Sequence, residues 1–124
     1  MSPTAEVATI ILPTLFPELD SEHFFSYSIP EIYQSFDVLP IFKVETVGEV
    51  NSDYGSDVYR ARTYKVQVMA FIDINKTDIE ATNDIMDRGM EENGYTQTYG
   101  EDRPHSENPS VHILIRQYTH SRRK

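Results

Sequence analysis

The stretch from Val58 to Asp73 constrains the fold most, because apolar and polar side chains alternate along it. Every second position from 64 to 72 is apolar or aromatic, which is the period of a half-buried strand. Near the end of the stretch, Met69 and Phe71 make the second face apolar as well. We therefore expect a central strand that is covered on both sides at that end.

A helix is predicted directly after this strand, at about residues 77–93. Thr77 and Glu80 form a Thr-x-x-Glu capping box, and Gly94 is placed as a left-handed C-terminal stop. The expected buried side comprises Ile79, Ala81, Ile85, Met86 and Met90.

The same helix carries a stripe of carboxylates at spacings of four, three and four residues, formed by Glu80, Asp84, Asp87 and Glu91. Such a stripe could hold a hard metal ion, but a solvated helix face is the commoner outcome.

The rest of the chain supplies further strands and a second helix. Strands are predicted at 41–50, 95–99 and 111–119, and a helix at about 3–12 with Ser2 as its N-cap. The segment NSDYGSD at 51–57 is predicted as a loop that closes an antiparallel hairpin. The fold class is therefore α+β: a single two-layer domain over residues 1–124, with a mainly antiparallel sheet of about four strands and both helices packed on it.

The connector at 19–39 is rich in aromatic residues, with Phe24, Phe25, Tyr27, Tyr33 and Phe36 set between prolines. It is expected to be an ordered loop with one helical turn near 30–36. Aromatic side chains in a connector indicate burial, either in the core of the domain or against another subunit.

The charge balance excludes some functions. Eleven basic and twenty acidic residues give a net charge of −9, although Arg122, Arg123 and Lys124 contribute +3 of it. An acidic body argues against nucleic-acid binding, which needs clustered Lys and Arg. It favours either simple solubility or a surface past which DNA moves without sticking. Residues 121–124, which have no apolar anchor, are expected to be a disordered basic tail.

Chemistry and targeting signals are sparse. The chain has no cysteine, its four histidines are scattered, and no Gly-x-Ser-x-Gly elbow or glycine-rich phosphate loop occurs. His112 and His120 would lie about 26 Å apart along one strand, which is too far for a shared metal. No apolar run is long enough for a membrane span, and no signal peptide is recognisable. We therefore expect a protein of the cytoplasm that is not an enzyme and has no metal or cofactor.

Several short motifs together resemble a known family. They are the Tyr-Gly-Ser-Asp turn at 54–57, the strand ending VQVMAFI, the helix closing with Glu-Asn-Gly-Tyr at 92–95, and the last strand ILIRQYT. Over residues 4–120 the chain resembles the tail terminators, or tail completion proteins, of siphophages that infect Gram-positive bacteria.

The resemblance implies a late structural virion protein with no enzymatic activity and no cofactor. It implies a homo-oligomeric ring, of six subunits, that caps the tail tube, ends tail polymerisation and offers a surface for head–tail joining. The implied partners are the major tail tube protein and a head completion or connector protein. The ring would lie at the head-proximal end of the virion tail after assembly in the host cytoplasm, and DNA would pass through it without specific binding.

The residues expected at subunit or partner interfaces lie in the hairpin and the tail: Tyr54, Asp57, Tyr59, Arg60, Arg62, Arg122, Arg123 and Lys124. Arginines at the start of the central strand could pair with an acidic neighbour, or equally extend into water or pair within the subunit. The tail could dock on an acidic protein face or only solubilise the chain. The alternative function is a small α+β adaptor or regulatory module that binds a partner in a groove between helix and sheet.

Overall fold

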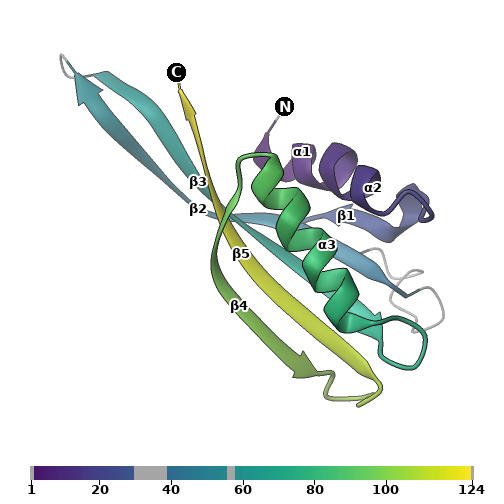
Figure 1. The fold of residues 1–124 in the computed structure, drawn as a ribbon. Coiled ribbons are helices and arrows are strands. Elements are labelled where there is room, and N and C mark those ends of the chain that lie inside the picture. Colours follow the sequence, from purple (N-terminus) through teal and green to yellow (C-terminus); the bar gives the residue numbers. More distant parts are fainter. Residues whose placement is uncertain (1, 30–38, 56–57, 124) are drawn as a thin grey trace.

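Five strands form one sheet in the order β1-β2-β3-β5-β4, and the helices lie on one of its faces (Figure 1). The computed structural model describes residues 2–29, 39–55 and 58–123, apart from the side chains of residues 50–55, 58–61 and 122–123. The strands are β1 Phe24–Ser26, β2 Ile41–Gly55, β3 Val58–Asp73, β4 Thr96–Pro104 and β5 Val111–Arg123.

The sheet confirms the predicted α+β class and the central place of β3. β3 pairs antiparallel with β2 on one side and with β5 on the other, and β4 pairs antiparallel with β5 at the sheet edge. The strand that the sequence did not predict is β1, which pairs parallel with β2. Its three residues are too few to show a period of two.

The core lies between the sheet and the helices. Alternate residues of β3 from Val66 to Ile72 are completely buried, as the alternation predicts. Phe42 on β2 is also completely buried, and the rings of Phe16 and Phe24 pack on it at centroid distances of 5.0 and 5.4 Å. The aromatic connector therefore contributes to this core through Phe24. The predicted helical turn near 30–36 lies outside the described residues.

The N-terminal helix begins where it was predicted to begin, because Ser2 Oγ accepts a hydrogen bond from the backbone N–H of Ala5. It consists of α1 Pro3–Glu6, a π-helical turn Val7–Ile11 and α2 Leu12–Leu15, so it runs beyond the predicted end at Leu12. Pro13 has no N–H to donate and its ring crowds the carbonyl four residues before it. The wider π turn just before Pro13 accommodates the proline within the helix.

The main helix, α3, spans Ile79–Glu92, and its start corrects the sequence prediction. The N-cap is Asp78, whose Oδ1 accepts from the N–H groups of Glu80 and Ala81, so the prediction of Thr77 as the cap is wrong. Both residue types cap helices well, and Asp78 is the one whose extended backbone brings its side chain to the first turn.

The end of α3 is as predicted. Gly94 has a φ of 87°, and its N–H donates to the carbonyl of Glu91, while the N–H of Tyr95 donates to the carbonyl of Met90. These two bonds form a Schellman motif, which requires the left-handed conformation that glycine adopts without strain.

The buried side of α3 is narrower than predicted. Met86 and Met90 are completely buried, but Ala81 and Ile85 are exposed. A Cβ built on buried Gly89 would overlap the side chain of Leu15, so α2 and α3 approach closely at this glycine. Ile85 is 44% exposed to solvent.

The second face of the sheet differs from the prediction, since no helix in the described part of the chain covers it (Figure 1). Met69 and Phe71 on this face are only partly buried. A polar row crosses the face, in which Gln117 Nε2 donates to Gln67 Oε1 at 2.9 Å and Gln67 Nε2 donates to Glu45 Oε1 at 3.4 Å. Within the described residues, none of the helices has the length and apolar character of a membrane span.

Candidate functional site

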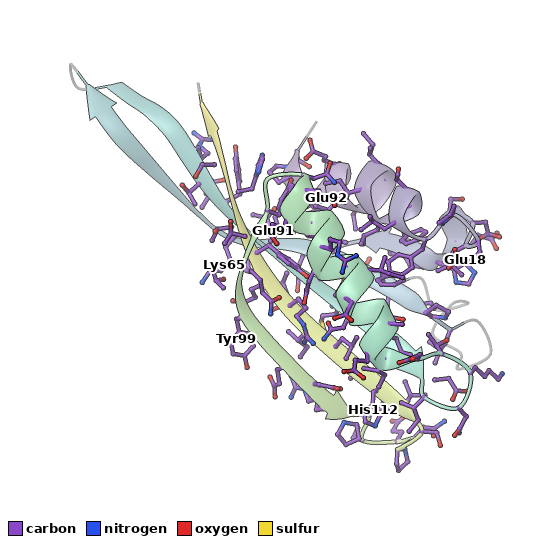
Figure 2. All side chains as sticks on the ribbon, viewed as in Figure 1. Glu18, Lys65, Glu91, Glu92, Tyr99 and His112 are labelled. Carbon is purple, nitrogen blue, oxygen red and sulfur yellow. The ribbon has the colours of Figure 1, made fainter. Side chains whose placement is uncertain are left out.

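A projecting ribbon, called here the arm, consists of residues 48–55 of β2 and 58–65 of β3. It extends away from the helices (Figure 1), and a register shift between Thr46 and Gly48 marks where it leaves the body. Figure 2 shows Lys65 at the base of the arm. The sequence correctly predicts an antiparallel hairpin, but the predicted loop at 51–57 is wrong over 51–55, because these residues pair with β3.

The strand register places the predicted interface residues together. Tyr54 pairs with Tyr59 near the tip of the arm, and Arg62 pairs with Arg122 of β5. The hairpin and the C-terminal segment are therefore neighbours in one ribbon. In the sequence analysis they were separate features. Arg60 belongs to β3, two positions before Arg62, and its side chain lies outside the described part of the chain. Asp57 and Lys124 lie outside the described residues.

The C-terminal segment corrects a second prediction. β5 continues to Arg123, which pairs with Ala61, so residues 121–123 are not an unpaired tail. Thr63 and Ser121 reinforce the pairing through a hydrogen bond between their hydroxyl groups at 2.8 Å. These residues form a strand because the long β3 provides backbone groups for them to pair with. The local sequence of the tail gives no sign of this distant partner.

Arg62 has an acidic neighbour within its own subunit. Its Nη1 lies 3.9 Å from Glu49 Oε1, and the two side chains are 32% and 53% exposed. Ion pairs with this much solvent contribute little to stability, roughly 0–1 kcal/mol. The pairing within the subunit that the sequence left open is therefore present, and it is weak enough to rearrange when a partner binds.

Charge is divided unevenly between the body and the ribbon that the arm forms with the C-terminal residues 119–124. Residues 48–65 and 119–124 contain six of the eleven basic residues and only three of the twenty acidic ones. This region is therefore at about +3 and the remainder at about −12. A positively charged ribbon on a negatively charged body is suited to contact with an acidic surface.

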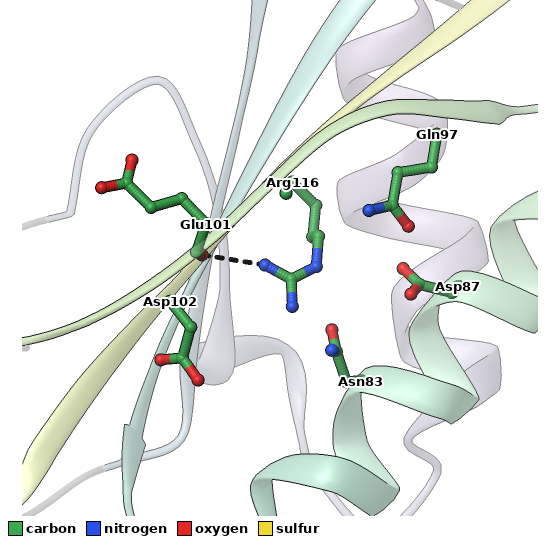
Figure 3. Close-up of a pocket in the computed structure, with 7 residues that line it drawn as sticks. Asn83, Asp87, Gln97, Glu101, Asp102 and Arg116 are labelled. Carbon is green, nitrogen blue, oxygen red and sulfur yellow. Dashed lines mark hydrogen bonds between the residues drawn. The ribbon is translucent and has the colours of Figure 1, made fainter.

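A second feature is a pocket of about 290 Å³ between α3 and the strands β4 and β5 (Figure 3). Its polar lining comes from seven residues: Asn83, Asp87, Gln97, Gly100, Glu101, Asp102 and Arg116. None of them was predicted as a site residue.

The pocket centres on Arg116, a charged residue that is only 6% exposed. Its Nη1 donates to the carbonyls of Glu101 at 2.8 Å and Ile115 at 3.0 Å. Its Nε and Oδ1 of Asn83 are buried, and neither atom has a hydrogen-bond partner. Figure 3 shows the guanidinium between Asn83 and the strands. A buried donor and a buried acceptor are thus left unsatisfied in the same pocket.

One wall of the pocket is fixed by Tyr118, whose hydroxyl donates to Asp87 Oδ1 at 2.6 Å. Burial of Tyr118, and then this hydrogen bond, raise the pKa of its phenol well above the ordinary value. The phenol therefore stays protonated and holds the Asp87 carboxylate at the edge of the pocket. Asp87 is the member of the predicted carboxylate stripe that turns toward the sheet, whereas Glu80, Asp84 and Glu91 are exposed.

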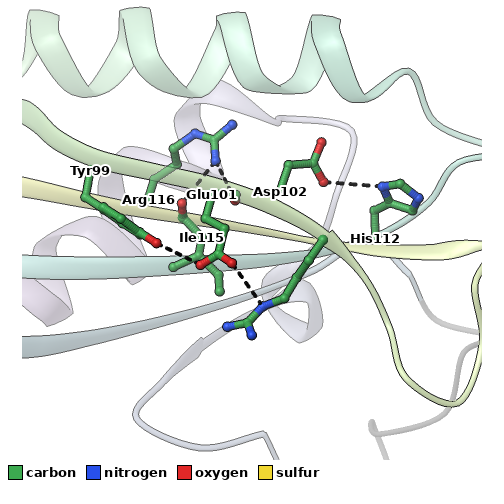
Figure 4. A network of polar contacts seen from close by, with 7 residues as sticks. Tyr99, Glu101, Asp102, His112, Ile115 and Arg116 are labelled. Carbon is green, nitrogen blue, oxygen red and sulfur yellow. Dashed lines mark hydrogen bonds and ion pairs between the residues drawn. The ribbon is translucent and has the colours of Figure 1, made fainter.

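The outer side of β4 carries a separate polar network (Figure 4). Tyr99 donates to Glu101 Oε2 at 2.8 Å, and Arg103 Nε lies 3.9 Å from Glu101 Oε1. The hydrogen bond to Glu101 is the main cause that raises the pKa of Tyr99. On the opposite side of β4, toward α3, Asp102 lines the pocket and its Oδ1 lies 3.3 Å from His112 Nδ1. The Glu101 side chain thus points away from the pocket, to which Glu101 contributes its carbonyl.

Within residues 2–29, 39–55 and 58–123, no three His, Asp or Glu side chains are grouped so that they could hold a metal ion. His120 is engaged structurally, because its ring stacks on Tyr95 at a centroid distance of 4.3 Å and its Nδ1 lies 3.0 Å from the Gly94 carbonyl.

Comparison with models of known protein families gives no match, and no curated protein matches the sequence. The arm and the pocket are therefore the two features from which function is inferred. The only sequence signal for the pocket is Arg116 itself, an arginine placed within the apolar run of the last strand.

Proposed function

We propose that this protein is a phage tail terminator: a structural protein that forms a homo-oligomeric ring, caps the tail tube and provides the surface for head–tail joining. The observation that carries this proposal is the basic ribbon, formed by the arm together with the C-terminal residues 119–124, on an acidic body. The resemblance in the sequence motifs suggests which assembly the protein belongs to. The arm provides a surface through which copies of the protein can associate.

The arm favours contact between subunits for two reasons. An isolated two-stranded ribbon is marginally stable in water, and β5 supports only residues 61–65 of this one. Together with residues 119–124 the arm is net positive, which matches the acidic body of a second copy, where α3 exposes Glu91 and Glu92 near its C-terminal end (Figure 2). Arm-to-body contact joins different surfaces of two copies, which generates a ring when the rotation closes.

The acidic body also suits the proposed place in the virion. A ring at the head-proximal end of the tail must let DNA pass, and a surface at about −12 per subunit repels phosphate groups. The partners in this proposal are the tail tube protein on one side and a head completion or connector protein on the other.

Deletion of the gene from the phage that encodes it tests the proposal. We expect tails of uncontrolled length and heads that lack tails, counted by electron microscopy, with recovery when the wild-type gene is supplied. Supplying Arg62→Glu should restore the phenotype poorly, whereas Lys76→Glu, an equal charge change in an exposed turn, should restore it fully. Tails of normal length joined to heads after deletion would refute the proposed function.

The pocket favours a second candidate, the small α+β binding module. Buried polar atoms without hydrogen-bond partners are unusual in a pocket that has only a structural role. In the deletion experiment this module predicts normal tails, so the two candidate functions have opposite outcomes.

A further inference from the structure

Arg116 is held in a way that leaves part of its binding capacity unused. The described residues place no carboxylate within 4.0 Å of its guanidinium, and its two hydrogen bonds both come from Nη1 to main-chain carbonyls. Its buried Nε–H has no acceptor. Buried charged groups are normally fully hydrogen-bonded, so this donor marks a position for an acceptor that enters from outside.

Asn83 supplies the complementary group from α3. Its buried Oδ1 has no donor, and it faces the Arg116 guanidinium across the pocket (Figure 3). An occupant that satisfies both atoms must accept one hydrogen bond and donate another a short distance away. Hydroxyl groups, water molecules and amides have this capacity, whereas a carboxylate has no donor and an ammonium or amidinium group has no acceptor.

The charges around the pocket disfavour both kinds of ion. Asp87 and Asp102 line the pocket and oppose an anion, and Arg116 opposes a cation. The volume of about 290 Å³ exceeds the share of one water molecule by about tenfold, so there is room for a group of several atoms. A planar amide matches the donor, the acceptor and the space together.

The position of the pocket indicates what carries the amide. β4 is the outer strand of the sheet, all but one of its residues are exposed, and the pocket opens beside it. An edge strand presents unpaired backbone groups to which another chain can add. A chain that lies along β4 would place every second side chain on the side of α3.

We propose that the pocket between α3 and β4 binds the uncharged amide side chain of an asparagine or glutamine on a partner polypeptide that lies along β4. Arg116 donates to the amide oxygen, and Asn83 accepts from the amide nitrogen. Gly100 keeps the entrance open, because a Cβ at this position would lie 3.3 Å from Arg116 Nε and 2.7 Å from the end of the Gln97 side-chain amide. This inference rests on the pocket alone and holds for either candidate function.

Three small molecules of nearly the same shape test the class of ligand: acetamide, acetate and acetamidinium, which are neutral, negative and positive at neutral pH. The Arg116 Nε–H signal in nitrogen-15 NMR spectra reports occupancy, and the exposed Arg88 and Arg103 serve as internal controls. We expect acetamide to shift the Arg116 signal with a dissociation constant on the order of millimolar, at least threefold tighter than either ion. Tighter binding of either ion would overturn the proposal, as would no binding of acetamide, which would mean that water alone fills the pocket.

Substitutions at Asn83 and Gly100 test whether acetamide binds in this pocket with Asn83 as its hydrogen-bond acceptor. Asn83→Leu should weaken acetamide binding at least tenfold, whereas Asn75→Leu, a matched change in an exposed turn, should leave binding unchanged. Thermal melts establish that both variants are folded. Gly100→Ala provides an independent check, because it narrows the entrance without removing a polar group of the pocket. Unchanged acetamide binding in both Asn83→Leu and Gly100→Ala would place the ligand elsewhere and refute the site.

A short blocked peptide with one glutamine distinguishes a partner chain from a free amide compound. We expect it to bind at least tenfold tighter than acetamide and to slow hydrogen exchange of the outward-facing backbone amides of β4. A peptide with glutamate in place of glutamine should lose this advantage. Equal affinity of the glutamine peptide and acetamide would refute a partner on β4, leaving a small amide compound as the ligand.

Discussion

The two long strands β2 and β3 run through two regions with different surroundings. In the body, Phe42, Val44, Val66 and Val68 lie beneath the helices and are completely buried. In the arm, beyond Thr46, the same two strands continue to pair backbone to backbone away from the helices. Strand pairing therefore persists beyond the part of the sheet that the helices cover, while the completely buried side chains described for these two strands lie in the body.

This comparison predicts that substitutions in the body change the stability of the subunit and that substitutions in the arm change its assembly. The largest effect is expected at the centre of the core. Phe42→Ala removes a ring that packs on Phe16 and Phe24, and it should lower the free energy of unfolding by about 3–5 kcal/mol. Tyr27→Ala is the control, because this side chain is 57% exposed. Equal midpoints for the two variants in urea unfolding would contradict the assigned core.

A smaller effect is expected at the boundary between core and pocket. Tyr118→Phe removes the hydrogen bond from the phenol to Asp87 Oδ1 and should cost about 1–2 kcal/mol at neutral pH. The raised pKa of folded Tyr118 keeps its phenol protonated, so its contribution is complete below the unfolded value near 10 and is lost as the pH rises above it.

Urea unfolding at pH 9 to 11 checks this sign. The wild type should lose stability more steeply than Tyr118→Phe above about pH 10. Tyr99→Phe should depart from the wild-type profile by less than Tyr118→Phe does, because Tyr99 is exposed and solvent weakens its hydrogen bond to Glu101. Parallel profiles for the wild type and Tyr118→Phe would show that Tyr118 ionises as readily in the folded protein as in the unfolded chain.

A smaller loss of stability is expected from substitutions at the N-cap of α3, at the surface of the body. Asp78→Ala removes the side chain that caps two backbone N–H groups and should destabilise the protein by about 1 kcal/mol. Thr77→Ala should change stability by less than about 0.5 kcal/mol, because the structure does not use Thr77 as the cap. A larger loss of stability from Thr77→Ala than from Asp78→Ala in thermal melts would show that Thr77 is the N-cap, as the sequence predicts.

The smallest effect on the subunit is expected in the arm. Arg62→Ala removes a partly exposed ion pair with Glu49, so stability should change by less than about 0.5 kcal/mol. Self-association, measured by sedimentation at increasing concentration or in the presence of tail tubes, should nevertheless weaken. Lys43→Ala, which changes a charge on the body half of β2, should leave association intact. A loss of stability without any loss of association would assign the arm to the fold of the subunit.

The elements whose signals are local could be predicted from the amino-acid pattern alone. Alternation along β3 predicted both its limits and its buried face, and Ser2 and Gly94 marked a helix start and a helix end through their own backbone bonding. The antiparallel hairpin followed from two strands separated by turn-forming residues. These features depend on neighbours within a few positions, so a single chain suffices to predict them.

Tertiary structure decided the features that depend on distant partners. Polar residues 51–55 became strand because β3 lay beside them, and residues 121–123 did so because β3 was long enough to pair with them. Arg116 was recognisable in the sequence as an odd residue in an apolar strand, but its pocket required Asn83 from a helix 33 positions earlier. Backbone hydrogen bonding and buried polar contacts are satisfied in space, and only the folded chain brings those partners together.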